Sequence, residues 1–246
     1  MPAVLASDAG DESTLQAGTS LLAPLYLGDG WLSANPLSIP TSPRDGRWLH
    51  TARGCRPVLG ALVLLNGVPG SGKSFLGPAL ARDLGLPRLG KDDIKEALWD
   101  ADPPGEGTDP LEWSRRLGAI AFDVLWRLAP SLGPRLILEA PFVDFHAELI
   151  LELHTTPIEV YLSASPEVLY RRYHHRHPGL HECHRFHPLP DLEEVVAFTA
   201  AARPLDLGGP LLRVDTTEGA DPAAVANWVR SQLALADPES MLSRSR

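Results

Sequence analysis

The stretch Gly67-Val68-Pro69-Gly70-Ser71-Gly72-Lys73-Ser74 decides the fold of this 246-residue chain. It follows the apolar run 62–65 and precedes a segment with helical spacing at 75–84, which is the strand-loop-helix context of a phosphate-binding loop, or P-loop. Its glycines let the backbone curl so that several N–H groups point at phosphate oxygens, and the positive end of the following helix dipole adds to that attraction. Lys73 would reach the β- and γ-phosphates, and Ser74 would place its hydroxyl on Mg²⁺. The stretch therefore predicts binding of a nucleoside triphosphate with Mg²⁺.

The composition limits the partners and the compartment. Lys and Arg number 22 against 31 Asp and Glu, a formal net charge of −9, which disfavours nucleic acid as the habitual partner because that binding depends on neutralised phosphates. The two cysteines, Cys55 and Cys183, are too few for a disulfide framework, so a reducing compartment is expected. No signal peptide and no apolar run of about 18 residues is visible, so we expect a cytoplasmic protein without a membrane anchor. The sequence leaves the oligomeric state open.

Composition also divides the chain. Residues 1–57 are rich in Ser, Asp, Gly and Pro without a sustained helical or strand period, so they are interpreted as a partly ordered extension whose function is not readable. Residues 58–236 alternate short apolar runs with helical segments and are interpreted as one P-loop domain. Residues 237–246 are interpreted as a flexible tail.

The same alternation predicts an α/β fold of three layers, with a parallel five-stranded sheet and helices on both faces. Gly85 is a helix stop, and Ser165 with Pro166 is an N-cap followed by proline at the first helical position. The expected strands are 61–66, 135–139, 158–162 and 211–215, with 87–90 as a short strand or turn. The expected helices are 75–84, 92–99, 111–128, 145–153, 191–202 and 222–235, with a further one from 166 through 172.

A pair of carboxylates follows the second strand. In Gly90-Lys91-Asp92-Asp93-Ile94-Lys95-Glu96, Asp92 is placed where a carboxylate could face the γ-phosphate and take a proton from a substrate hydroxyl. The simpler interpretation is that Asp92 or Asp93 only caps the following helix. With two adjacent aspartates, one can cap while the other takes part in catalysis. This feature favours a kinase over other P-loop proteins.

Four segments together resemble a known family, the small P-loop kinases of the AAA-like ATP-binding group, which includes chloramphenicol phosphotransferase and the kinase domain of polynucleotide kinases. They are residues 67–74, Asp92-Asp93-Ile94-Lys95-Glu96-Ala97-Leu98, residues 136–141 and Arg176-His177-Pro178-Gly179. The resemblance covers residues 60–236 and implies that Asp92 is the general base. It also implies that Lys95 contacts the substrate, as the matching basic residue does in polynucleotide kinases, although chloramphenicol phosphotransferase has an apolar residue there.

Glu139 ends the buried strand 135–139, at the edge where α/β sheets bind ligands. Many P-loop proteins carry an aspartate at this place that helps to hold Mg²⁺, usually through water. Because glutamate is longer by one methylene, Glu139 is assigned either to the waters of the metal or to orienting the substrate. The alternative is a strand-end carboxylate that faces solvent or a helix N-terminus.

Arginines gather after the fourth strand, where the resemblance implies that residues 166–190 form a mobile lid over ATP. Guanidinium groups bind phosphate bidentately and stabilise the charge of a transferred phosphoryl group. We therefore expect Arg172 and Arg176 to act in catalysis and Arg171 to contact ATP. The alternative is a solvated basic helix face.

Histidines are also concentrated in this segment. Imidazole and thiolate are ligands that zinc prefers, but the spacing lacks the paired two-residue knuckles of common zinc sites. A polar mobile loop is the simpler interpretation, and metal binding by the lid stays open. The residues in question are His181, Cys183, His184 and His187.

Together these features predict an enzyme that uses ATP and Mg²⁺ to phosphorylate a hydroxyl of a small molecule, which the sequence does not name. The alternatives are a 5′-hydroxyl polynucleotide kinase, favoured by Lys95 and opposed by the net charge, and a non-catalytic ATP-binding regulatory protein. The expected catalytic residues are Lys73, Asp92, Arg172 and Arg176. The expected ATP-binding residues are Gly67, Val68, Pro69, Gly70, Ser71, Gly72, Lys73, Ser74, Phe75 and Arg171. The expected substrate-binding residues are Asp92, Lys95 and Glu139, and the expected Mg²⁺-binding residues are Ser74 and Glu139.

Overall fold

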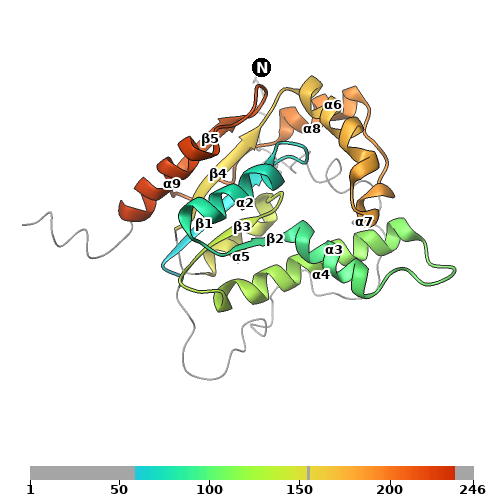
Figure 1. Ribbon diagram of the computed structural model, residues 1–246, viewed down its shortest axis with the longest axis horizontal. Helices are drawn as coiled ribbons and strands as arrows, with labels where there is room; N and C mark the ends of the chain where they lie inside the picture. Colours follow the sequence, from blue (N-terminus) through green and yellow to red (C-terminus); the bar gives the residue numbers. More distant parts are fainter. Residues whose placement is uncertain (1–58, 154–155, 236–246) are drawn as a thin grey trace, which may run out of the picture.

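The computed structural model describes residues 59–153 and 156–235. In these ranges five strands form one parallel sheet in the order β2-β3-β1-β4-β5 (Figure 1). The strands are β1 Ala61–Gly67, β2 Arg88–Gly90, β3 Arg135–Glu139, β4 Ile158–Ser163 and β5 Leu211–Asp215. The α-helices are α2 Lys73–Leu84, α3 Lys91–Ala101, α4 Pro110–Leu128, α5 Ala147–Leu151, α6 Pro166–Arg176, α7 Glu182–Arg185, α8 Leu192–Ala201 and α9 Pro222–Leu235, and the 3-10 turns are η1 Ala129–Ser131, η2 Asp144–His146 and η3 His177–Gly179.

Helices cover both faces of the sheet, which gives three layers (Figure 1). On one face the side chains of Val63 and Leu65 pack under α2 and α9, and on the other those of Leu62 and Leu64 pack under α4 and α5. All seven residues of β1 are buried, as expected for a central parallel strand with a helix layer on each side. The predicted three-layer P-loop fold is thus confirmed.

The strand register places the functional edge. β1 lies between β3 and β4, so the chain leaves β1 at the point where the strand order reverses, which is where open α/β sheets bind ligands. Leu65 pairs with Glu139, and Glu139 pairs in turn with Gly90. The loop after β1, the end of β3 and the start of α3 therefore meet at the same edge of the sheet.

Most predicted elements are confirmed, several of them to the residue. Gly85 ends α2 with φ 65°, and the Ser165 side chain caps α6 ahead of Pro166. The helix expected at 145–153 is present but shorter, because Ala147–Leu151 is α-helical and the 3-10 turn η2 precedes it. The preceding turn is held by the Val143 N–H, which donates to Nδ1 of the buried His146 at 3.0 Å.

The predicted extension, residues 1–57, and the predicted tail, residues 237–246, lie outside the described residues. The predicted lid contains α6, η3 and α7, and Figure 1 shows α7 beside α3 and α4 at one end of the molecule. None of the helices in residues 59–153 and 156–235 is long and apolar enough to cross a membrane.

Candidate active site

The loop between β1 and α2 has the backbone of a phosphate cradle. Gly67, Gly70 and Gly72 have φ of 141°, 82° and 96°, in or next to the left-handed region that side chains disfavour. A Cβ on Gly67 would stand 2.3 Å from the carbonyl oxygen of Leu162. Gly72 is the N-cap of α2, and no side chain caps this end, so the first-turn N–H groups are oriented for an anion.

Lys73 lies folded against this loop. Its Nζ donates to the carbonyl oxygens of Gly67 at 2.8 Å and Val68 at 3.0 Å, and 8% of the residue is exposed. Burial lowers the pKa of Lys73 to about 8, against the opposing effect of the carboxylates of Asp92 and Glu139. The ammonium group is therefore within electrostatic reach of both predicted acidic site residues.

Asp92 lies in the first turn of α3. The N-cap of α3 is Gly90, with no side-chain cap, so the interpretation that Asp92 or Asp93 caps this helix is wrong. Oδ1 of Asp92 accepts from Nζ of Lys91 at 3.0 Å. The Asp92 side chain is 53% exposed. Partial desolvation raises its pKa, but the positive charges of Lys91 and Lys73 outweigh this effect, and the pKa lies below the usual range. Asp92 is therefore a carboxylate that stays ionised.

Glu139 is buried at the end of β3 and has a cationic partner. Nη1 of Arg88 donates to its Oε2 at 2.5 Å. Burial raises the pKa of Glu139 above the usual range, while Arg88, Lys73 and a hydrogen bond from the Ser74 hydroxyl act against the rise. The alternative of a Glu139 side chain that faces solvent is therefore wrong. Hydroxyl and carboxylate oxygens are the donors that Mg²⁺ prefers, so Ser74 and Glu139 fit a magnesium ion.

Arg172 connects the lid to the loop and to the end of the sheet. It donates from Nη1 to the Gly70 carbonyl at 3.3 Å and to Oγ1 of Thr216 at 3.0 Å, and from Nη2 to the Thr216 carbonyl at 2.5 Å. Oγ1 of Thr216 in turn donates to the Ser71 carbonyl at 2.9 Å. The P-loop is thus braced by two residues that follow it by 102 and 145 positions.

The other predicted nucleotide contacts differ in their surroundings. The Arg176 guanidinium lies 5.1 Å from the centre of the Tyr173 ring. Its positive charge lowers the pKa of Lys73, an effect smaller than those of burial and of the two carboxylates. Arg171 is exposed, and so is Phe75, at 69%. Val68 is buried and packs beside the lid helix α6. The structure therefore brings Arg172 to the loop. It leaves Arg171 and Arg176 exposed, with Arg176 in electrostatic reach of Lys73.

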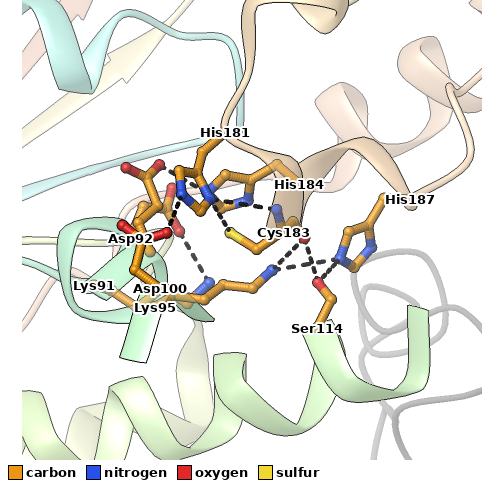
Figure 2. A network of polar contacts seen from close by, with 10 residues as sticks. Lys91, Asp92, Lys95, Asp100, Ser114, His181, Cys183, His184 and His187 are labelled. Carbon is orange, nitrogen blue, oxygen red and sulfur yellow. Dashed lines mark hydrogen bonds and ion pairs between the residues drawn. The ribbon is translucent and has the colours of Figure 1, made fainter. Parts of the chain in front are cut away.

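The histidine-rich segment docks on α3 and α4 (Figure 2). Nε2 of His181 lies 3.0 Å from Oδ1 of Asp100, and Nε2 of His184 lies 3.0 Å from Oε1 of Glu96. Burial lowers the pKa of His184 to about 4, so at neutral pH an uncharged imidazole meets Glu96. In the same way, burial lowers the pKa of His187 to about 4.

Lys95 is covered by this docked segment. It is 3% exposed, and its Nζ lies 3.4 Å from the Cys183 carbonyl oxygen and 3.5 Å from Nε2 of His187. The Ser114 hydroxyl donates to the same carbonyl at 2.5 Å and lies 2.8 Å from Nε2 of His187. Burial lowers the pKa of Lys95 to about 8. With the lid docked, the Lys95 ammonium is closed off from solvent.

The zinc interpretation of the lid finds no support in the part of the chain that the structure describes. In it, no three His, Cys, Asp or Glu side chains are grouped as metal ligands. His181, His184 and His187 diverge to different partners on α3 and α4 (Figure 2). Cys183 is buried beside Trp99 and Leu117, and burial raises the pKa of its thiol to about 11, the opposite of what a metal-binding thiolate needs.

Comparison with known proteins places the chain in a family. An AAA domain family model matches residues 62–179. The solved structure of a candidate kinase from Chloroflexus aurantiacus J-10-fl is 37% identical, with a TM-score of 0.62, and the match covers 70% of this chain and 97% of that one. The chain belongs to this family of small P-loop kinases.

More distant structures also match this P-loop kinase. A gluconokinase from Sinorhizobium meliloti 1021 is 20% identical with a TM-score of 0.45, over 76% of this chain and 99% of that one. A shikimate kinase from Bacteroides thetaiotaomicron is 19% identical with a TM-score of 0.44, over 70% of this chain and 98% of that one. Both are too distant to bear on its activity. No curated protein matches the chain.

Two residues of this P-loop kinase site were missed by sequence reasoning. Arg88 lies in the three-residue strand β2, and its only signal is a basic side chain just before the paired aspartates. Thr216 follows β5 directly, so its signal is a polar residue at the carboxyl end of the last strand. Neither position has a fixed spacing from the P-loop, and only the paired strands bring them to it.

Proposed function

We propose that this protein transfers the γ-phosphate of ATP to a hydroxyl group of a small molecule. One observation carries the proposal: the Lys73 ammonium, the Ser74 hydroxyl and the carboxylates of Glu139 and Asp92 lie at one edge of the sheet, close enough to act on one another's charge. A phosphate cradle, a pair of oxygen ligands and an ionised carboxylate are the parts that phosphoryl transfer needs.

The loop and Lys73 would bind the triphosphate. N–H groups at the start of α2 hydrogen bond the phosphate oxygens, and Lys73 exchanges the carbonyls of Gly67 and Val68 for the β- and γ-phosphates. Ser74 and Glu139 would hold Mg²⁺, which neutralises charge on the β- and γ-phosphates when it is bound. Together, the loop, Lys73, Ser74 and Glu139 would hold the γ-phosphate in line with the acceptor hydroxyl.

Asp92 would orient the acceptor hydroxyl. Its ionised carboxylate accepts a hydrogen bond from the hydroxyl and points the oxygen at the γ-phosphorus. The new bond joins the acceptor oxygen to that phosphorus, the bond from the γ-phosphorus to the β,γ-bridging oxygen breaks, and ADP leaves. Asp92 takes the hydroxyl proton as the new bond forms and, because its pKa is low, then releases the proton to solvent. Arg176 would stabilise the charge on the transferred group.

The experiment is a search for an acceptor that raises ATP consumption. Purified protein with Mg²⁺ is assayed for ADP release against nucleosides, sugars, sugar acids, antibiotics with free hydroxyls and a 5′-hydroxyl oligonucleotide. For the acceptor that responds, Asp92→Asn should lower kcat by about 10²- to 10⁴-fold, with ATP affinity retained. The control is Asp123→Asn, which removes an exposed carboxylate paired with Arg127 on α4.

The outcomes separate the proposal from its rivals. If only the oligonucleotide is phosphorylated, the acceptor is the 5′ end of a nucleic acid and not a small molecule. ATP binding without turnover on any acceptor would favour a regulatory protein. An Asp92→Asn variant with unchanged turnover would remove Asp92 from the chemistry.

A further inference from the structure

The side chain of Arg88 joins the metal side of the site to the acceptor side. Its Nη1 donates to Oε2 of Glu139 at 2.5 Å, and its Nη2 donates to Oδ2 of Asp93 at 2.6 Å. Glu139 ends β3 beside Ser74, whereas Asp93 belongs to α3, the helix that carries Asp92. One planar guanidinium group therefore connects two elements with different roles, and a lysine has no second donor at the same spacing.

Two glycines leave room for this side chain. A Cβ on Gly77 would stand 2.3 Å from Oε2 of Glu139 and 3.1 Å from Cδ of Arg88. A Cβ on Gly90 would stand 2.3 Å from Oδ2 of Asp93 and 2.7 Å from Nη1 of Arg88. Gly77 lies inside α2 with helical backbone, where glycine is less favourable than alanine by about 1 kcal/mol. Space for the ion pair, rather than backbone conformation, explains glycine at both positions.

The two arms of Arg88 differ in burial. The Glu139 side chain is 7% exposed and the Asp93 side chain 58%. A buried carboxylate that loses its cationic partner turns toward another cation, and the nearby cation is Lys73. This turn withdraws the carboxylate from Ser74. An exposed pair contributes little by comparison.

We propose that Arg88 is a positioning residue that holds the Glu139 carboxylate toward Ser74 for the magnesium ion and, through Asp93, fixes α3 relative to the P-loop. The proposal rests on the proposed function, in which Ser74 and Glu139 hold Mg²⁺. Loss of Arg88 should therefore raise the Mg²⁺ concentration that nucleotide binding requires, and should have a smaller effect on acceptor binding.

The test measures binding of a fluorescent N-methylanthraniloyl derivative of ATP as Mg²⁺ is added, with EDTA as the metal-free reference. Arg88→Lys should raise the half-saturating Mg²⁺ concentration about tenfold, with a smaller effect on metal-free binding, because a single ammonium does not fix the orientation of the buried Glu139 carboxylate as the planar guanidinium does. Gly77→Ala, which pushes Glu139 away, should do the same with Arg88 intact. Asp93→Asn should shift the Mg²⁺ titration by less than twofold, because its arm is exposed.

The matched control is Arg82→Lys, at an exposed arginine on α2 that pairs with Asp83 at 3.5 Å; its titration should be that of the wild type. Thermal melting of each variant verifies folding, and Arg88→Lys keeps the charge should Arg88→Ala not fold. A wild-type Mg²⁺ titration in both Arg88→Lys and Gly77→Ala would overturn the proposal. If the titration shifts as expected while no acceptor is ever phosphorylated, the positioning role stands and the kinase proposal fails.

Discussion

The P-loop and the docked histidine segment are built in different ways. The P-loop is eight consecutive residues whose shape comes from positive-φ glycines and from the helix that follows. The segment around α7 is fixed by contacts to residues far away in the sequence, such as His181 with Asp100 and Ser114 with the Cys183 carbonyl. The P-loop is a local structure, whereas the docked histidine segment forms only after tertiary packing.

This difference predicts which substitutions disrupt the P-loop and which disrupt the docked histidine segment. A local backbone shape fails when a side chain is added where there is no room, and it then disturbs the whole fold. A docked segment fails when one of its few hydrogen bonds is removed, and it then opens while the rest of the domain stays folded. The predictions below test this contrast, from the largest expected effect to the smallest.

Gly67→Ala should cost about 2–5 kcal/mol of unfolding free energy, since it combines an unfavourable φ with a clash at the Leu162 carbonyl. Gly85→Ala is the matched control, because Gly85 also has positive φ but nothing lies within 4 Å of its added Cβ. It should cost about 1–2 kcal/mol. Urea unfolding of both variants measures the difference, and equal costs would mean that space at Gly67 is not limiting.

ATP affinity should fall as the pH rises above about 8, by up to about tenfold per pH unit. Burial sets the pKa of Lys73 to about 8 in the free protein, and bound phosphates raise it by stabilising the ammonium form. Below the free pKa the lysine is charged in both states and affinity is flat. Above it, the free protein must take up a proton to bind. Titration with the fluorescent ATP derivative from pH 7 to 9.5 checks this, and a flat profile would contradict it.

Ser114→Ala should make Cys183 react with dithiodipyridine about fivefold to tenfold faster, since the lid loses a hydrogen bond to the Cys183 carbonyl worth about 1–1.4 kcal/mol. The sequence has a second cysteine, so the assay uses a Cys55→Ser background. Ser231→Ala removes a similar hydroxyl-to-carbonyl bond on α9 and should leave the rate unchanged. Equal rates in Ser114→Ala and the parent would mean that this bond does not hold the lid.

Asp100→Asn should change the same labelling rate by less than twofold. Its partner His181 is 25% exposed and Asp100 is 71% exposed, and such pairs contribute little in water. A tenfold acceleration would show that the exposed end of the docked segment, rather than the Ser114 end, controls opening.

Prediction from the sequence succeeded where structure is local. The strands 135–139 and 211–215 and the helix 222–235 were predicted with their observed ends, because apolar runs, caps and prolines act over a few residues. The helix expected at 145–153 is shorter in the structure, where a 3-10 turn held by the buried His146 ring precedes it. The role of Lys95 could not be judged either, since its cover comes from a segment about ninety residues later.

The sequence by itself determined the three-layer P-loop fold, the phosphate cradle and the candidate roles of Lys73, Ser74 and Asp92. These follow from short motifs whose geometry is set by neighbouring residues. Only the tertiary structure decided that Arg88 joins Glu139 to Asp93, that Arg172 braces the loop through Thr216, and that the histidines dock on α3 and α4. Such contacts depend on which strands pair and which helices pack, and a linear spacing does not encode them.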